Sequence, residues 1–145
     1  MEKEKNPAKE FLLQVKKLDT MINNMQDELV RLNGMTTKVT ASWSSEAVAG
    51  SGSQDKLGDT IAKIIDLQNE INKNIDRLID KKREVSAVID RVQSARQIRV
   101  LYLRYFDHQT WESIAYNMGL SYQGVCKIHG RALESVKKVL EKAKS

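Results

Sequence analysis

A short segment of this chain gathers side chains that can recognise nucleic-acid bases. Within two turns after Ser121 stand four of them, namely Tyr122, Gln123, Cys126 and Lys127. Glutamine can pair with adenine through two hydrogen bonds, lysine can donate to guanine acceptors, and tyrosine can pack against a thymine methyl group or reach a phosphate. With Ser121 as helix cap, Val125 and Ile128 point inward and these four side chains face outward. We therefore take the four as candidate base-reading residues.

Other residues nearby suit contacts to the sugar-phosphate backbone. Arg131 follows Lys127 by one turn, and Thr110 and Ser121 stand where two helices are expected to begin, with amides that can bind phosphate. The alternative interpretations are plain: Lys127 and Arg131 can be ordinary solvated charges, and Cys126 can pack at the groove edge. We keep Thr110, Ser121 and Arg131 as candidate DNA contacts.

The elements that would position these residues have the pattern of a helix-turn-helix. Such a motif needs a small residue where its helices cross and a residue that tolerates positive φ in the turn, and Ala115 and Gly119 meet these needs. Apolar anchors flank both, namely Ile114, Met118, Leu120 and Val125. Thr110 and Ser121 stand at the two expected N-caps.

Positive charge is concentrated in the same part of the chain. Residues 94–145 hold nine Lys and Arg against four Asp and Glu, whereas residues 1–93 hold fifteen of each kind. The whole net charge of +5 therefore belongs to the C-terminal segment. An even spread of lysines would say little, but this segregation favours a polyanionic partner.

The composition predicts an all-α protein. The 145 residues include a single proline, 41% are hydrophobic and 30% are charged. Helix-forming residues dominate, and no alternating β-branched run predicts a sheet. Apolar residues spaced by threes and fours predict a helix over residues 8–32, which Asn33 and Gly34 are expected to end. Residues 33–55 read as a flexible connector, in which Trp43 either folds back on the helices or contacts a partner.

A second long helix is predicted from about Asp55 to Val92. Its apolar residues recur every seven positions, as Leu57, Ile64, Ile71, Leu78, Val85 and Val92. The expected companion positions of this heptad are Ile61, Gln68, Ile75, Lys82 and Ile89. This is a coiled-coil seam, which predicts a long antiparallel helical hairpin with the first helix. Ile65, Ile79 and Val88 widen the apolar stripe, and the second helix is expected to be longer than the first. The sequence therefore leaves two alternatives, self-association through these helices or a purely intramolecular hairpin.

A boundary is predicted near residue 93. Ser94 and Gln97 have the spacing of a capping box, and a helix with an apolar face follows until Asp107, His108 and Gln109 break it. We expect two domains, a hairpin with its connector over residues 1–93 and a helix-turn-helix module over residues 94–145.

Other function classes find little support in the residues. Cys126, His129 and His108 fall short of a structural zinc pattern, so we expect no metal and no cofactor. No phosphate-binding loop, nucleophile elbow or carboxylate pair predicts an enzyme. The lone cysteine, the charged N-terminus and the lack of a long apolar run predict a cytoplasmic protein without membrane contact.

The C-terminal third resembles region 4 of sigma factors. The segments that carry the resemblance are residues 99–106, 110–115 and 121–133, of which the stretch from Lys127 to Leu133 is the most specific. The complete layout is similar to small phage-encoded regulators of the ArpU/RinA type. This resemblance implies a four-helix module that reads a promoter element. It also implies activation of phage late or packaging genes, with host RNA polymerase as a further partner.

The sequence thus predicts a phage or prophage regulator of transcription that binds specific double-stranded DNA, forms homo-oligomers and is associated with the nucleoid of a bacterial host. A small terminase subunit or similar packaging adaptor that uses the same motif is the alternative, and a ring of many copies would favour it. A third interpretation is a scaffold or polymerase-binding factor whose sigma-like module contacts protein.

Overall fold

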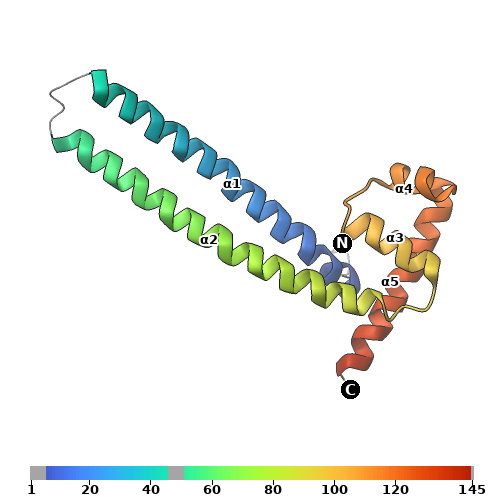
Figure 1. Ribbon diagram of the computed structural model, residues 1–145. Coiled ribbons are helices and arrows are strands. Elements are labelled where there is room, and N and C mark those ends of the chain that lie inside the picture. The colour runs from blue at the N-terminus through green and yellow to red at the C-terminus, as the bar shows by residue number, and fades with distance from the viewer. Residues whose placement is uncertain (1–5, 46–50, 145) are drawn as a thin grey trace, which may run out of the picture. The chain divides into compact units, whose positions relative to one another are not determined.

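The protein is built from helices joined by short connections (Figure 1). The computed structural model describes residues 6–45 and 51–144, with the side chains of residues 39–45 and 51–54 left aside. In these ranges it contains α1 (Pro7–Ser45), α2 (Ser51–Ile89), α3 (Ala95–Tyr105), α4 (Trp111–Met118) and α5 (Tyr122–Lys144). No strand occurs among the described residues, which confirms the all-α prediction. None of the described helices is long and apolar enough to cross a membrane.

The chain divides into two compact units, but not at the expected boundary. One unit comprises residues 1–18 together with 78–145, and the other comprises residues 19–77. The division expected at residue 93 separates segments that pack together, because the first turns of α1 and the last turns of α2 share a core with α3 and α5. The larger unit is therefore made of two separate stretches of sequence.

Within the unit of residues 19–77, α1 and α2 pack as an antiparallel pair (Figure 1). Ile22 and Leu32 are buried on α1, and Ile71 and Asn74 are buried on α2. The Asn74 amide donates to the Met25 sulfur at 3.3 Å and accepts from Arg77 at 3.1 Å, so its polar groups are satisfied.

The prediction of a connector over residues 33–55 is wrong at both of its ends. Helix α1 continues through Asn33 and Gly34 to Ser45, and α2 begins at Ser51. Both helices have 39 residues, so the expected mismatch in their lengths is absent. A glycine inside a helix costs only about 1 kcal/mol, which neighbouring contacts can offset. The expected role of the Trp43 side chain falls outside the described residues.

The heptad seam also differs in part from the expected one. Ile71, Val85 and Val92 are buried as predicted, but among the companion positions Ile61 and Gln68 are exposed. Over residues 55–77, the side of α2 that faces α1 instead includes Asn74, three positions after Ile71. Of the predicted companions, Ile89 is buried in the larger unit, whereas Ile61 is left in solvent. Ile65, which was expected to widen the stripe, is also exposed.

The larger unit is held by a core to which four helices contribute. Its buried side chains come from α1 (Ala8, Leu12, Val15), from α2 and the residues after it (Val85, Ile89, Val92), from α3 (Leu101, Tyr105) and from α5 (Ala132, Val136). We call this cluster the base core. Burial of such side chains is the main favourable contribution to the stability of a helical unit.

Hydrogen bonds fix α3 against its neighbours. The Tyr102 hydroxyl donates to Asp90 at 2.8 Å and lies 2.6 Å from the Ser86 hydroxyl, which ties α3 to the end of α2. Ser94 caps α3 as predicted by accepting from the Gln97 amide at 3.3 Å. The Gln97 side chain, expected to complete a capping box, instead accepts from the Ser135 hydroxyl of α5 at 2.6 Å.

The base core predicts a sharp contrast between two neighbouring leucines of α1. Leu12 is 0% exposed and Leu13 is 37% exposed. We expect Leu12→Ala to lower the free energy of unfolding by about 2–5 kcal/mol because it leaves a cavity. Leu13→Ala should change it by under about 1 kcal/mol. Urea denaturation followed by circular dichroism measures both, and equal losses would contradict this description of the core.

Candidate nucleic-acid interface

The C-terminal helices surround a second cluster of buried side chains. It contains Val100 and Leu103 of α3, Ile114 and Ala115 of α4, and Val125 of α5. The partly buried residues packed against it are Trp111, Met118, Leu120 and Ile128. We call this cluster the head core, and it fixes α4 and α5 relative to each other. The apolar anchors expected from the sequence, Ile114, Met118, Leu120 and Val125, all contribute to it.

The connection between α3 and α4 is held by one glutamine. The backbone carbonyl of Gln109 accepts from the Arg104 guanidinium at 2.9 Å, and its backbone N–H donates to the Leu103 carbonyl at 3.0 Å. Its side-chain oxygen accepts from the Asn117 amide at 2.8 Å. His108 beside it has a positive φ of 55°, which turns the chain between the helices. The break expected at residues 107–109 is confirmed, since α3 ends at Tyr105.

The turn between α4 and α5 has the backbone conformation that the sequence predicted. Gly119 is left-handed, with φ of 65° and ψ of 35°. Its N–H donates to the Tyr116 carbonyl at 3.3 Å, and the Leu120 N–H donates to the Ala115 carbonyl at 2.9 Å, which satisfies the last carbonyls of α4. The angle at which α5 leaves the turn is therefore set by backbone hydrogen bonds.

Thr110 and Ser121 are both helix caps. The Thr110 hydroxyl accepts from the Ser113 amide at 3.1 Å, and the Ser121 hydroxyl accepts from the Gly124 amide at 3.0 Å. Both residues are exposed, so the first turns of α4 and α5 are accessible from solvent. Capping confirms their structural role, while their contact with DNA stays a prediction.

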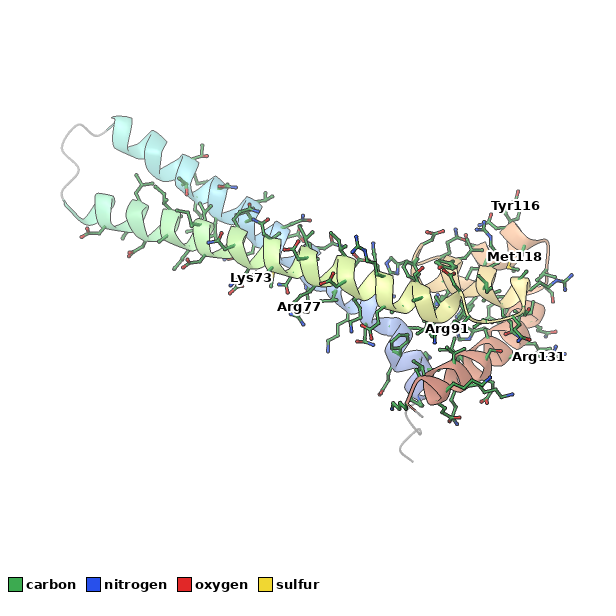
Figure 2. All side chains as sticks on the ribbon, turned by 60° about the horizontal axis from the view of Figure 1, so that its bottom comes forward. Lys73, Arg77, Arg91, Tyr116, Met118 and Arg131 are labelled. Carbon is green, nitrogen blue, oxygen red and sulfur yellow. The ribbon has the colours of Figure 1, made fainter. Side chains whose placement is uncertain are left out.

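The other candidate residues lie together on the exposed side of α5. Tyr122, Gln123, Cys126, Lys127 and Arg131 are all exposed, whereas Val125 is completely buried. Figure 2 labels Arg131 on α5. At 100° per residue, Gln123 and Lys127 lie near the centre of this side, with Cys126 and Arg131 toward its edges. We call these five residues the α5 face.

Glu134 marks the end of the α5 face. It is exposed and lies one turn after Gly130, in line with Gln123 and Lys127. A carboxylate at this position repels phosphates and guanine acceptors, so the part of α5 suited to DNA is its first two to three turns.

The Tyr122 hydroxyl remains a hydrogen-bond donor at neutral pH. Cys126, which lies one turn later on the helix, is the main cause that raises the pKa of Tyr122, and the Glu112 carboxylate of α4 adds to it. Tyr122 is half exposed, so its O–H can reach an acceptor on a partner. A protonated phenol suits contact with a phosphate oxygen or a base acceptor.

His129 has a structural position that the sequence did not reveal. Its Nε2 lies 2.7 Å from the Tyr105 hydroxyl, and its ring packs edge-on against Trp111 with ring centres 4.5 Å apart. The Arg104 guanidinium stacks over the Trp111 ring, with 4.2 Å between the guanidinium carbon and the ring centre. This group of four joins α3, α4 and α5, which explains why His129 does not point outward with Cys126.

Burial holds His129 in its neutral form. The pKa of His129 is lowered to about 4, mainly by burial and then by the positive charges of Lys9 and Arg104. Burial also raises the pKa of Tyr105 to about 12, so the hydroxyl keeps its proton. No group of three His, Cys, Asp or Glu with metal-binding geometry is found in the described part of the chain.

Tyr116 is an exposed residue that the sequence interpretation missed. Its side chain is 88% exposed, near the C-terminal end of α4, where Figure 2 labels it beside Met118. The signal was present, because Trp111, Ile114, Ala115 and Met118 define an inward side and Tyr116 falls opposite to them. The first helix of the motif therefore presents an aromatic ring to solvent.

Two glycines of this region predict opposite effects of the same substitution. Gly119 has positive φ, whereas Gly130 lies inside α5 with no atom within 4 Å of an added Cβ. We expect Gly119→Ala to destabilise the protein by about 1–2 kcal/mol. Gly130→Ala should stabilise it by up to about 1 kcal/mol because alanine favours helix. Thermal unfolding compares the two, and a stabilising Gly119→Ala would refute the left-handed turn.

His129 predicts an acid-dependent loss of stability. Since its folded pKa is about 4 and an unfolded histidine has a pKa near 6.5, the unfolded state binds one more proton between these values. The free energy of unfolding should therefore fall as pH drops from about 6.5 to about 4. His129→Phe keeps a ring but cannot titrate, so it should lose less stability over this range. Parallel pH profiles of the two proteins would contradict the burial of a neutral His129.

Comparison with known proteins adds a family without an assigned activity. No curated protein and no solved structure matches the chain significantly. The family model described as "Protein of unknown function (DUF1492)" matches residues 38–137, from the last turns of α1 into the second half of α5. This match includes α2, the head core, the turn and the whole α5 face, and it covers more than half of the chain. The chain therefore belongs to the DUF1492 family.

Proposed function

We propose that this protein is a transcriptional regulator that binds specific double-stranded DNA, with α5 in the major groove. The observation that carries the proposal is the α5 face. Five exposed side chains able to contact bases or phosphates occupy the start of a helix whose opposite side is anchored in the head core. An α-helix fits the major groove of B-DNA, and motifs of this type contact base edges with the first turns of their second helix.

Each residue of the α5 face has a role that follows from its chemistry. Gln123 and Lys127, near the centre, face the base edges, where an amide pairs with adenine and an ammonium donates to guanine. Tyr122 contacts a phosphate or a thymine methyl group, and Cys126 lies at the groove edge. Arg131 contacts a phosphate and so sets the position of α5 along the duplex.

The charge distribution supports a polyanionic partner. Residues 94–145 carry all of the net charge of +5. The amides exposed at the capped starts of α4 and α5 add partial positive charge on the same module. Neutralisation of several phosphates releases counterions, so binding weakens steeply with salt.

The resemblance of the sequence to sigma-factor region 4 and to ArpU/RinA-type regulators supports a role in phage or prophage transcription. On this proposal the protein activates late genes from a site near their promoter, in the cytoplasm of a bacterial host and in association with its nucleoid. RNA polymerase is then a second partner, and the exposed Tyr116 of α4 is available for such a contact. The proposal requires no catalysis and no cofactor.

Selection of bound sequences from random duplex DNA, at near-physiological salt, tests the proposal. We expect the full chain to enrich a defined site. Gln123→Ala and Lys127→Ala should each weaken binding to that site by about 5- to 150-fold, which corresponds to about 1–3 kcal/mol per base contact. Arg131→Ala should weaken binding to every sequence alike and reduce the slope of log affinity against log salt by about 1.

The matched control is Lys73→Ala on α2, which removes the same charge from an exposed lysine of the other unit. It should leave both the site and the affinity unchanged. Failure to enrich any sequence, or the same site and affinity after Gln123→Ala and Lys127→Ala, would exclude base reading by the α5 face.

A further inference from the structure

Helix α2 carries a row of four isoleucines, three of which are exposed in the described structure. Ile61 is 43% exposed, Ile65 is 54% exposed and Ile79 is 46% exposed. Ile75 is half-buried in the same row, and between the two pairs stand the exposed amides Gln68 and Asn72. At 100° per residue these six residues fall within about 40° of one line along the helix. We call them the α2 stripe.

The α2 stripe is separate from the surface that α1 uses. The residues that α2 buries in the hairpin, such as Ile71 and Asn74, lie round the helix from it. The charged residues Lys63, Asp66, Glu70, Lys73 and Arg77 lie on a third side, which Figure 2 locates through the labels of Lys73 and Arg77. An uncharged row between a buried seam and a charged side has the pattern of an interhelical contact.

The order of residues along the stripe is a mirror image about residue 70. Ile61 and Ile79 are equally distant from this point, as are Ile65 and Ile75, and as are Gln68 and Asn72. Two identical helices that pair antiparallel about residue 70 would therefore place isoleucine against isoleucine twice on each side and amide against amide at the centre. Such self-complementarity is the requirement of an interface with two-fold symmetry, in which each copy offers the same surface.

We propose that two copies of this chain associate through the α2 stripe, antiparallel and centred on residue 70. Apolar burial of the eight isoleucines drives the association. The central amides favour this register, because a shift by one heptad would place both Gln68 and Asn72 against isoleucine. Gln68 donates to Asn72 at 3.2 Å within one chain, and the remaining donors and acceptors of each amide are available to the second copy. This proposal goes beyond DNA binding and does not depend on it.

The second copy is favoured over an unrelated helical partner by the position of the two amides. Spacings of four and three residues are symmetric in any heptad, but here both amides stand at the centre and two isoleucines stand on each side. A foreign helix would require no such symmetric order of residue types. The heptad geometry of α2 also supports it, since a helix with two adjacent apolar stripes can serve two neighbours at once.

Charge substitutions at the outer pair distinguish this arrangement from others. Ile61 and Ile79 are both exposed, so a charged side chain at either position leaves the hairpin core intact. We expect the full chain to be a dimer in sedimentation equilibrium. Ile61→Glu and Ile79→Lys should each raise the dissociation constant by about 100-fold, because each places two charges against isoleucine.

The double variant Ile61→Glu/Ile79→Lys is the decisive measurement. In the antiparallel dimer each new glutamate faces a lysine of the second copy, so affinity should recover by about tenfold relative to either single variant. A parallel pair would instead place glutamate against glutamate and lysine against lysine, and association would weaken further. Val30→Glu, an aliphatic-to-glutamate change at a 70% exposed position of α1, should leave the dimer unchanged.

Several outcomes would overturn the proposal. One is a full chain that remains monomeric at about 100 μM, a concentration at which even a weak dimer would form. The others are a closed ring of many copies and a dimer that Ile61→Glu does not weaken. Lack of recovery in the double variant would exclude the antiparallel register. Circular dichroism of each variant checks that helical content is retained, so that a loss of association is not a loss of folding. Since no DNA is present, failure here leaves the DNA-binding proposal to its own test.

Discussion

Tyr105 connects the two clusters of apolar side chains on which the larger unit depends. Its ring is buried in the base core with residues of α1, α2 and α5, while its hydroxyl meets His129, whose ring lies against Trp111 of the head core. Hydrogen bonds in such a poorly solvated environment are expensive to leave unmade. The contact between Tyr105 of α3 and His129 of α5 therefore links the two cores, and it helps to set the orientation of α5.

Helix α5 belongs to both cores along its length. Val125, in its first turn, is buried in the head core, whereas Ala132 and Val136, further along, are buried in the base core. One side of the helix is thus committed to packing from its beginning to its middle. The opposite side of the same turns is the α5 face, and its direction is set by contacts that the exposed residues do not make themselves.

Local signals in the sequence were sufficient for much of the C-terminal part. The cap at Ser94, the break at residues 107–109, the caps at Thr110 and Ser121 and the left-handed Gly119 each depend on a few neighbouring residues, and all five features are present. The exposure of the α5 face follows from the same periodicity. These features could be predicted because helix ends are governed by short-range hydrogen bonds.

The remainder depended on contacts between residues distant in sequence. Gly34 carries a common helix-end signal, yet α1 continues beyond it because α2 lies opposite. The pairing of Tyr105 with His129 spans 24 residues, and no spacing rule for a single helix reveals it. Asn74 is buried in place of Ile75, which the heptad predicted, because the buried side of α2 depends on how α1 lies against it.

The discontinuous composition of the larger unit limits how the chain can be cut. A fragment that starts at Ser94 would contain the caps, the turn and the α5 face, but it would lack Leu12, Val15, Val85 and Ile89, which cover Leu101, Ala132 and Val136. Apolar side chains uncovered in this way favour loosened packing and aggregation. The smallest autonomous version of the module therefore needs the two ends of the hairpin, joined through a shortened helical pair or a short linker in place of residues 19–77.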